Sequence, residues 1–326
     1  MADNKTYVPW INWAKIVGIY LVTLGHGHLV SDDVRVLIYS FHMPLFFVLS
    51  GVLYKRRGFV ETVRKTFKTL LIPYFLISFI CLGYYLALLG LQGGITWIDI
   101  WNRVGAIFLG LGYEANNWIP VSSPMWFVIA LWVVYLLMSL SQSKHWDLAV
   151  LLIAVVASLV LHFTRIDTLL PIDSALVAMP FFVVGYKLKN FIINTDFKRV
   201  VIPALILLPV WYLVAAYNGR VDMCGCNYGR SIILFYLAGM MMCFIVISLC
   251  KIFQTGGGQK YASGTFLVMG FNIIAVNITE LVWKYFVPAT PINTIIGAAL
   301  GLLILAVFYP IIVLCKKYFP IIIGNR

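Results

Sequence analysis

Lys15 and His26 form the first pair of residues in the sequence whose types and spacing could do chemistry. Both fall in one apolar run, and they are eleven positions apart, which is close to three turns of an α-helix. One helix would carry both side chains on one face, about 16 Å apart along its axis. Ionisable groups are costly in hydrocarbon, so this pair indicates a functional site. Taken singly, Lys15 could snorkel to the membrane interface, and His26 could make a hydrogen bond between helices.

A histidine in such a place can act as a general base or carry an acyl group during transfer. We therefore predict one of these two roles for His26. Lys15 could attract phosphates or polarise a carbonyl group. Asn12 lies one turn before Lys15 on the same face and is a further candidate for the site.

The next apolar run holds a second candidate, His42, within the sequence FHMP. Pro44 has no backbone N–H and frees a carbonyl group, so a polar neighbour is expected there. Ser50 and Gly51 follow and allow close approach of another helix. For Ser50 itself, packing is the favoured interpretation. Glu280, in a later run, is expected near the end of its helix, within reach of water.

A basic segment at 55–68 follows the second run and contains Arg64, Lys65 and Lys68. These three cations could bind the phosphates of an acyl donor. Orientation in the membrane and contact with anionic lipid explain the same charges, at about 1 kcal/mol per residue. The two interpretations are compatible.

The composition defines the elements that must position these residues. Of 326 residues, 62% are hydrophobic and only 11% are charged, against roughly a quarter charged in a soluble domain. The composition excludes a soluble fold and a disordered chain. It predicts an all-α polytopic membrane protein that forms one transmembrane domain over 1–326. The net charge of +12 lies mostly between apolar runs, which favours membrane lipid over nucleic acid as a partner.

A membrane span needs about 20 apolar residues of helix. Ten runs approach that length, and we predict about ten transmembrane helices in one bundle. They cover roughly 9–31, 34–54, 69–91, 124–140, 147–163, 174–188, 199–217, 231–250, 262–284 and 294–315.

Basic residues between the runs predict the orientation of the bundle. Under ten spans, 17 Lys and Arg fall on one side and six on the other. The positive-inside rule then places both termini and the 55–68 segment in the cytoplasm. The longest loop, about 92–123, would face outward, and its aromatic residues suit a membrane interface or stacking on sugar.

One Cys-x-Cys pair, at 224 and 226, is too little for a metal site, so no metal is expected.

The motifs around these residues resemble the membrane acyltransferase 3 family. The stretch from Ile11 through His26 resembles the opening of the family, a basic residue followed after ten residues by histidine. Residues 39–51, with the sequence YSFHMPLFFVLSG, look like its second-span motif, and 68–74 like its third-span entry. Met125-Trp126-Phe127 and 181–185 are similar to weaker landmarks, which makes Trp126 a candidate. The resemblance is nearest to the sugar and polysaccharide O-acetyltransferase branch, similar to fucose 4-O-acetylase-like proteins.

The resemblance implies a ten-helix bundle that takes an acyl group, usually acetyl, from cytoplasmic acyl-CoA. The acceptor would be a hydroxyl of a carbohydrate or a lipid-linked glycan of the cell envelope, and the location a multi-pass protein of a bacterial cell membrane. The chain departs from the family pattern in two places. Many members have Asp where this chain has Asn12, and His where it has Asn272.

Two other functions fit the sequence. A transporter or flippase of a glycan or lipid-linked intermediate would also need intramembrane polar groups. The lack of a visible inverted repeat and the clustering of polar residues in the first two spans favour the enzyme. A non-catalytic sensor or scaffold is the third hypothesis, because of Asn12 and Asn272.

For the enzyme, the distance from Lys15 to His26 predicts an extended donor arm, such as the pantetheine of acetyl-CoA, threaded through an open path in the bundle.

Overall fold

A computed structural model describes residues 8–115, 117–141, 143–164, 168, 170–254, 256–287 and 292–324. Helices dominate these ranges, whose only β-structure is two isolated bridges. The helices are α1 (Pro9–His26), α2 (Asp32–Tyr39), α3 (His42–Leu53), α4 (Phe59–Thr66), η1 (Phe67–Leu71), α5 (Ile72–Leu91), α6 (Trp97–Leu109), η2 (Ser123–Met125), α7 (Trp126–Leu140), α8 (Lys144–Thr164), α9 (Ile172–Lys187), α10 (Lys189–Asn194), α11 (Phe197–Asn218), α12 (Ile232–Cys250), α13 (Gln259–Ala262), α14 (Thr265–Gly270), α15 (Asn272–Phe286), α16 (Thr294–Tyr318) and η3 (Pro320–Ile323).

Seven helical stretches within the described ranges are long and apolar enough to cross a membrane. They are Asp32–Leu53, Phe59–Leu91, Ser123–Leu140, Trp146–Thr164, Phe197–Asn218, Ile232–Cys250 and Thr294–Tyr318. The structure thus confirms an all-helical, multi-pass membrane protein. The other three predicted runs form α1, α9 and the series α13–α15. The count of ten spans and the cytoplasmic position of both termini stay predictions.

Two predicted spans are interrupted. The run at 34–54 breaks at Ser40 and Phe41, between α2 and α3, because Pro44 near the start of α3 has no N–H to donate to the turn before it. The run at 262–284 divides into α14 and α15 around Phe271. Two side chains satisfy the backbone at this second break: Ser122 Oγ donates to the Gly270 carbonyl oxygen at 2.6 Å, and Cys81 Sγ donates to the same oxygen at 3.6 Å.

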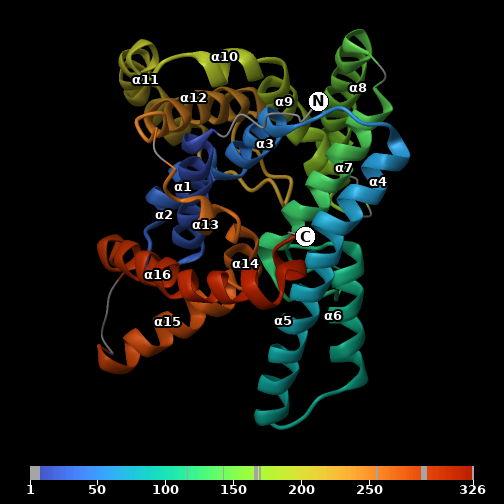
Figure 1. The fold of residues 1–326 in the computed structure, drawn as a ribbon. Coiled ribbons are helices and arrows are strands. Elements are labelled where there is room, and N and C mark those ends of the chain that lie inside the picture. Colours follow the sequence, from blue (N-terminus) through green and yellow to red (C-terminus); the bar gives the residue numbers. More distant parts are fainter. Residues whose placement is uncertain are drawn as a thin grey trace.

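The long loop predicted at 92–123 contains a helix, α6. Thr96 begins it with a capping box, in which the Thr96 hydroxyl accepts from the Asp99 amide and the Asp99 carboxylate accepts from the Thr96 amide. The spacing Thr-x-x-Asp before an apolar stretch was a readable signal for this helix. Figure 1 shows α5 and α6 extending together away from the other helices. Trp97 and Trp101 of α6 are largely exposed, so this helix presents aromatic side chains at the surface.

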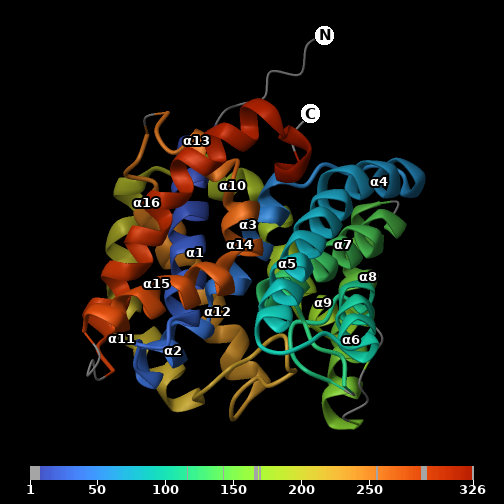
Figure 2. The same ribbon diagram turned by 90° about the horizontal axis from the view of Figure 1, so that it is seen from below.

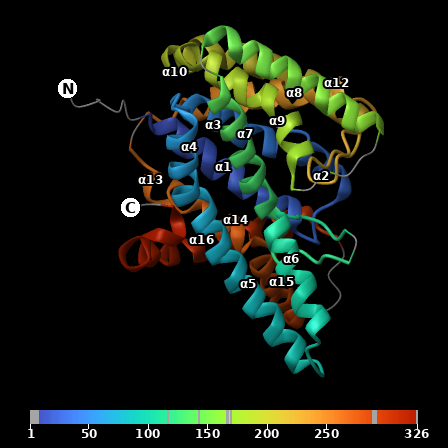
Figure 3. The same cartoon turned by 90° about the vertical axis from the view of Figure 1, so that its right-hand side faces the viewer.

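Helix α1 lies at the centre of the bundle, in contact with α2, α3, α12, α13, α14, α15 and α16 (Figure 2). The start of α1, the end of α3, α4 and α10 lie at one end of the bundle. The end of α1, α2, the start of α3 and the 219–231 segment lie at the other (Figure 3). Each residue of α1 can therefore be assigned to one of the two ends.

Helix α3 packs against α9 at backbone distance, through one glycine on each helix. A Cβ atom on Gly51 would lie 2.0 Å from the Phe182 carbonyl oxygen, and one on Gly185 would lie 2.1 Å from the Val48 carbonyl oxygen. Only glycine permits this approach. The close helix approach expected at Gly51 is confirmed.

We expect Gly51→Ala to lower the apparent melting temperature of the purified protein, because the methyl group must push two backbones apart. Overpacking costs about 1–3 kcal/mol even where side chains can yield, and here the obstacle is backbone. Gly83→Ala is the matched control: it lies inside α5, and a Cβ there meets no atom within 4 Å. The control should melt no lower than the wild type. Equal melting temperatures for both variants would contradict the packing role.

Candidate functional site

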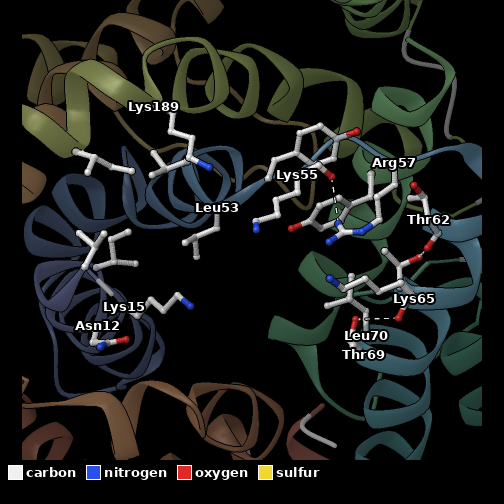
Figure 4. A pocket seen from close by; sticks show the side chains of 17 residues that line it. Asn12, Lys15, Leu53, Lys55, Arg57, Thr62, Lys65, Thr69, Leu70 and Lys189 are labelled. Atoms are coloured by element: carbon white, nitrogen blue, oxygen red, sulfur yellow. Dashed lines mark hydrogen bonds between the residues drawn. The ribbon is translucent and has the colours of Figure 1, made fainter. Parts of the chain in front are cut away.

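A cavity of about 900 Å³ opens at the end of the bundle where α1 begins. We call it the cation cavity, because five basic side chains line it. These are Lys15, Lys55, Arg57, Lys65 and Lys189. Figure 4 shows them converging on the space from α1, the 54–57 segment, α4 and α10. No Asp, Glu, His or Cys is among the described residues that line it, so the cavity is suited to bind an anion.

Of the three basic residues predicted from the 55–68 segment to bind the donor, only one lines the cation cavity. Lys65 lines it, whereas Arg64 and Lys68 do not. Only one face of the α4–η1 helix, with Thr62, Lys65, Thr66 and Thr69, turns toward the cavity. Lys65 and Lys68 are three residues apart and lie on one side of the helix, so the packing of the helix, and not its periodicity, makes this selection.

Sequence reasoning missed Lys55, Arg57 and Lys189 as members of this site. Lys189 follows α9 and is more than a hundred positions from the others, so only the fold brings it to the cavity. Arg57 is additionally paired with Glu61 at 3.0 Å.

Asn12 lies in the cation cavity beside Lys15. It is fourteen residues from His26 on the same helix, about 21 Å along the axis. The side chain at position 12 is therefore too far away to orient the His26 ring. The Asp-to-Asn departure from the family pattern concerns the cation cavity.

A buried ion cluster holds the chain beside the cation cavity. The Asp147 carboxylate, which is fully buried, pairs with Arg56 Nη2 at 2.5 Å and with Lys187 Nζ at 2.7 Å. The Ser141 hydroxyl donates to it at 2.7 Å. Arg56 stands between Lys55 and Arg57, so this cluster anchors the segment that carries both cavity residues. A buried carboxylate needs such partners to offset its desolvation.

His26 and His42 meet in a second, smaller cavity of about 80 Å³. We call it the histidine cavity. It lies where α1 ends and α3 begins. The Tyr39 ring is near both imidazoles, with its centroid 6.2 Å from that of His26 and 4.9 Å from that of His42. The structure thus brings together two of the predicted catalytic residues and leaves the third, Lys15, in the other cavity.

The hydrogen bonds of the two histidines favour a role as proton acceptors. His42 Nδ1 lies 2.9 Å from the Ile38 carbonyl oxygen. A carbonyl oxygen can only accept, so Nδ1 carries the proton, and Nε2 of the neutral ring keeps its lone pair. The His26 ring nitrogens have no hydrogen-bond partner within the described ranges. Both rings can therefore accept a proton from a hydroxyl group in the cavity.

Other groups around the histidine cavity come from distant segments. Trp126, predicted as a candidate, lines it from the start of α7, and Tyr113, Ser123, Asp222 and Cys224 complete the wall. Burial, followed by the nearby Asp222 carboxylate, raises the pKa of the Cys224 thiol well above its usual value. Cys224 is thus a neutral thiol and a poor nucleophile. Nothing in the sequence indicated that the 222–224 segment belongs here.

Asn272 lies outside the three cavities of the described structure but touches the helix that carries His26. It is fully buried, and its Nδ2 donates to Thr23 Oγ1 at 2.9 Å. Thr23 precedes His26 by three residues on α1. Asn272 therefore braces the last turn of α1.

The structure also shows where Ser50 and Glu280 lie, the two remaining polar residues considered in the sequence. Ser50 lines none of the three cavities, and its neighbour Gly51 makes the helix contact. Glu280 was expected near water, and this was wrong. Its side chain is buried and accepts from the backbone amides of His28 at 2.7 Å and Leu29 at 3.4 Å. Those amides lie just beyond the end of α1, where the backbone no longer satisfies them itself.

Lys15 and His26 line two separate cavities, and the open path predicted between them stays a prediction. The two cavities share no lining residue among the described ones. Helices α1, α3 and α7 each line both cavities at opposite ends, and the Phe46 ring fills the space between. A Cβ on Gly18 would lie 2.8 Å from this ring, and the Phe127 ring centroid lies 5.7 Å from it. Gly18 is on the same face of α1 as Lys15 and His26, so the Phe46 ring lies against α1 between these two residues.

The chain is a multi-pass membrane protein with helices of spanning length. Its interior holds a cationic cavity and, apart from it, a smaller cavity with two histidines. Residues 8–315 match the family model described as an acyltransferase domain. The chain belongs to the acyltransferase 3 family and is an acyltransferase by membership. This decides against the transporter interpretation. No curated protein and no solved structure matches the chain.

Proposed function

We propose that this protein transfers an acetyl group from acyl-CoA to a hydroxyl of a carbohydrate or a lipid-linked glycan. The family match supports acyl transfer. The observation that carries the proposal is the division of the interior: five cations in one large cavity and two histidines in a small one, joined by α1, α3 and α7. Binding of a polyanionic donor and proton transfer thus have separate places.

The donor binds in the cation cavity by this proposal. CoA carries a pyrophosphate and a ribose phosphate, and Lys and Arg form charge-assisted hydrogen bonds with such groups. Five basic side chains around one cavity favour the entry of a polyanionic ligand. The excess of basic residues at this end of the bundle supports a cytoplasmic location, where CoA is found.

The reaction takes place at the histidine cavity. His26 or His42 takes the proton of the acceptor hydroxyl, whose oxygen attacks the thioester carbonyl carbon. The carbon–sulfur bond then breaks, and the CoA thiolate leaves and receives a proton. The cation cavity offers no imidazole, carboxylate or thiol among its described residues, which supports the histidines as the base. The donor arm reaches them when the Phe46 ring moves aside.

Replacing either histidine tests this assignment. We expect His26→Ala and His42→Ala to lower the rate of acetyl transfer by a factor of about 10²–10⁴, the usual worth of a general base. The KM for acetyl-CoA should change little, because the donor phosphates bind in the other cavity. His28→Ala is the control, since His28 is exposed just beyond α1 and contacts Asn277. Near-normal turnover in both His26 and His42 variants would contradict the proposal. Covalent acetyl on His26 would show an acyl carrier instead of a base.

The cation cavity predicts which basic residues bind the donor. Lys65→Ala and Arg57→Ala should each raise the KM for acetyl-CoA about tenfold, the value of one hydrogen bond to a charged group. Arg64→Ala and Lys68→Ala remove the same charge from the same segment but outside the cavity, and should leave this KM nearly unchanged. Equal effects of all four substitutions would indicate a contact with membrane lipid.

The Phe46 ring is expected to limit access to the histidines from the cation cavity. In Phe46→Leu the smaller side chain should admit water, so that acetyl-CoA hydrolysis rises several-fold relative to transfer in a coupled assay with free-thiol detection. Phe181→Leu is the control, because Phe181 is also buried but packs against Phe235 and Tyr236 and lines neither cavity. An unchanged ratio in Phe46→Leu would place the donor route elsewhere.

A further inference from the structure

A third cavity, of about 680 Å³, lies beside the histidine cavity. It is lined by the end of α8, the start of α9 and residues 225–229, and we call it the hairpin cavity. Residues 222–224 line the histidine cavity instead. One short hairpin, closed by the backbone pair of Asp222 and Asn227 at 2.6 and 2.9 Å, is thus the wall between the two cavities.

The sizes of the two cavities separate their roles. Ligand pockets usually measure about 300–1,000 Å³. The hairpin cavity lies within that range, and the histidine cavity, at about 80 Å³, lies far below it. The histidine cavity has room for the reacting groups but not for a sugar ring. Most of the acceptor must therefore be held elsewhere, close to the histidines.

The polar groups of the hairpin cavity suit hydroxyl groups. Asp173 Oδ1 accepts from the Ser174 amide at 2.6 Å. Asp173 Oδ2, the side-chain Nδ2 of Asn227 and both His162 ring nitrogens have no hydrogen-bond partner within the described ranges. Together they offer an acceptor, a donor and a group that can do either. Neutral polyols present the same mixture of donors and acceptors.

Aromatic rings supply the apolar side of the cavity. The His162 ring centroid lies 5.4 Å from that of Phe163 and 5.5 Å from that of Tyr228. The apolar face of a sugar ring packs on such surfaces, while its hydroxyl groups reach the polar side chains. None of the described residues that line the cavity is Lys or Arg, and this lining favours a neutral ligand.

We propose that the hairpin cavity binds a neutral sugar ring of the acceptor glycan, through Asp173, Asn227 and His162. The neighbouring part of the glycan then reaches His26 and His42 past the hairpin. Ser174 anchors this hairpin to α9, since its hydroxyl donates to the Met223 carbonyl oxygen at 2.8 Å. This assignment rests on the proposed acyl transfer and names the acceptor subsite for it.

Sugar binding to the whole protein tests the assignment. The protein is placed in lipid nanodiscs, because maltoside detergents carry a disaccharide themselves. Chitobiose, lactose, maltose and cellobiose are the probes, and binding is measured by saturation-transfer NMR and titration. At least one probe should bind the wild type. Asp173→Asn, Asn227→Ala and His162→Phe should each weaken it about tenfold. Asp33→Asn, an exposed position on α2 at the same end of the bundle, is the matched control.

Acetyl-CoA hydrolysis without sugar is measured in parallel and should be the same in the Asp33→Asn control and the wild type. If no probe binds the wild type, or if the three cavity variants bind as well as Asp33→Asn, the sugar assignment is overturned, whatever the hydrolysis rate. If a probe binds as expected but acetyl-CoA is neither cleaved nor used, the sugar subsite stands and the proposed acyl transfer falls.

Discussion

The close approach of α3 to its two neighbours is the constraint on which the rest of the structure depends. On one side, Gly51 and Gly185 bring the backbones of α3 and α9 into contact. On the other, the Phe46 ring of α3 rests against Gly18 of α1. In a membrane, lipid tails are as apolar as leucine, so helices associate mainly through such tight packing. Because α3 is held from both sides, its two ends have defined positions relative to α1, and the two cavities form at those ends.

The division between the cavities has an electrostatic reason. A phosphate-bearing donor needs several cations, and these are cheapest to keep near water at the end of a bundle. A neutral imidazole that accepts a proton works best away from such charges, because nearby cations disfavour its protonated form. Helix α1 satisfies both requirements by carrying Lys15 near its start and His26 at its end. The buried cluster of Arg56, Asp147 and Lys187 then holds the segment that completes the cationic end.

Breaks in the helices are as important to the interior as the helices themselves. The break before α3 turns His42 toward His26 and leaves the Ile38 carbonyl oxygen to orient its ring. The break before α15 places Asn272 against Thr23, one turn from His26. Interrupted backbone inside a membrane persists only where side chains satisfy it, as Ser122 does at the Gly270 carbonyl oxygen. Polar contacts that repair the backbone thus also assemble the site.

Much of this protein follows from its sequence alone. The apolar runs predicted membrane helices, because segments of that length with so few charges are suited to the hydrocarbon core of a bilayer and not to water. The spacing of Lys15 and His26 placed them on one face of one helix, and the proline in FHMP marked His42 as unusual. Periodicity and local chemistry are properties of neighbouring residues, so the sequence contains them.

Only the tertiary structure decided which distant residues share a cavity. It assigned Lys189 and Lys65 to one cavity, excluded Arg64 and Lys68, and brought Asp222 and Cys224 to the histidines. It also placed the Phe46 ring against Gly18, between Lys15 and His26, although Phe46 looks like any other apolar position of α3. Contacts between helices depend on the rotation and crossing of each helix relative to the others, and packing of the whole bundle sets those.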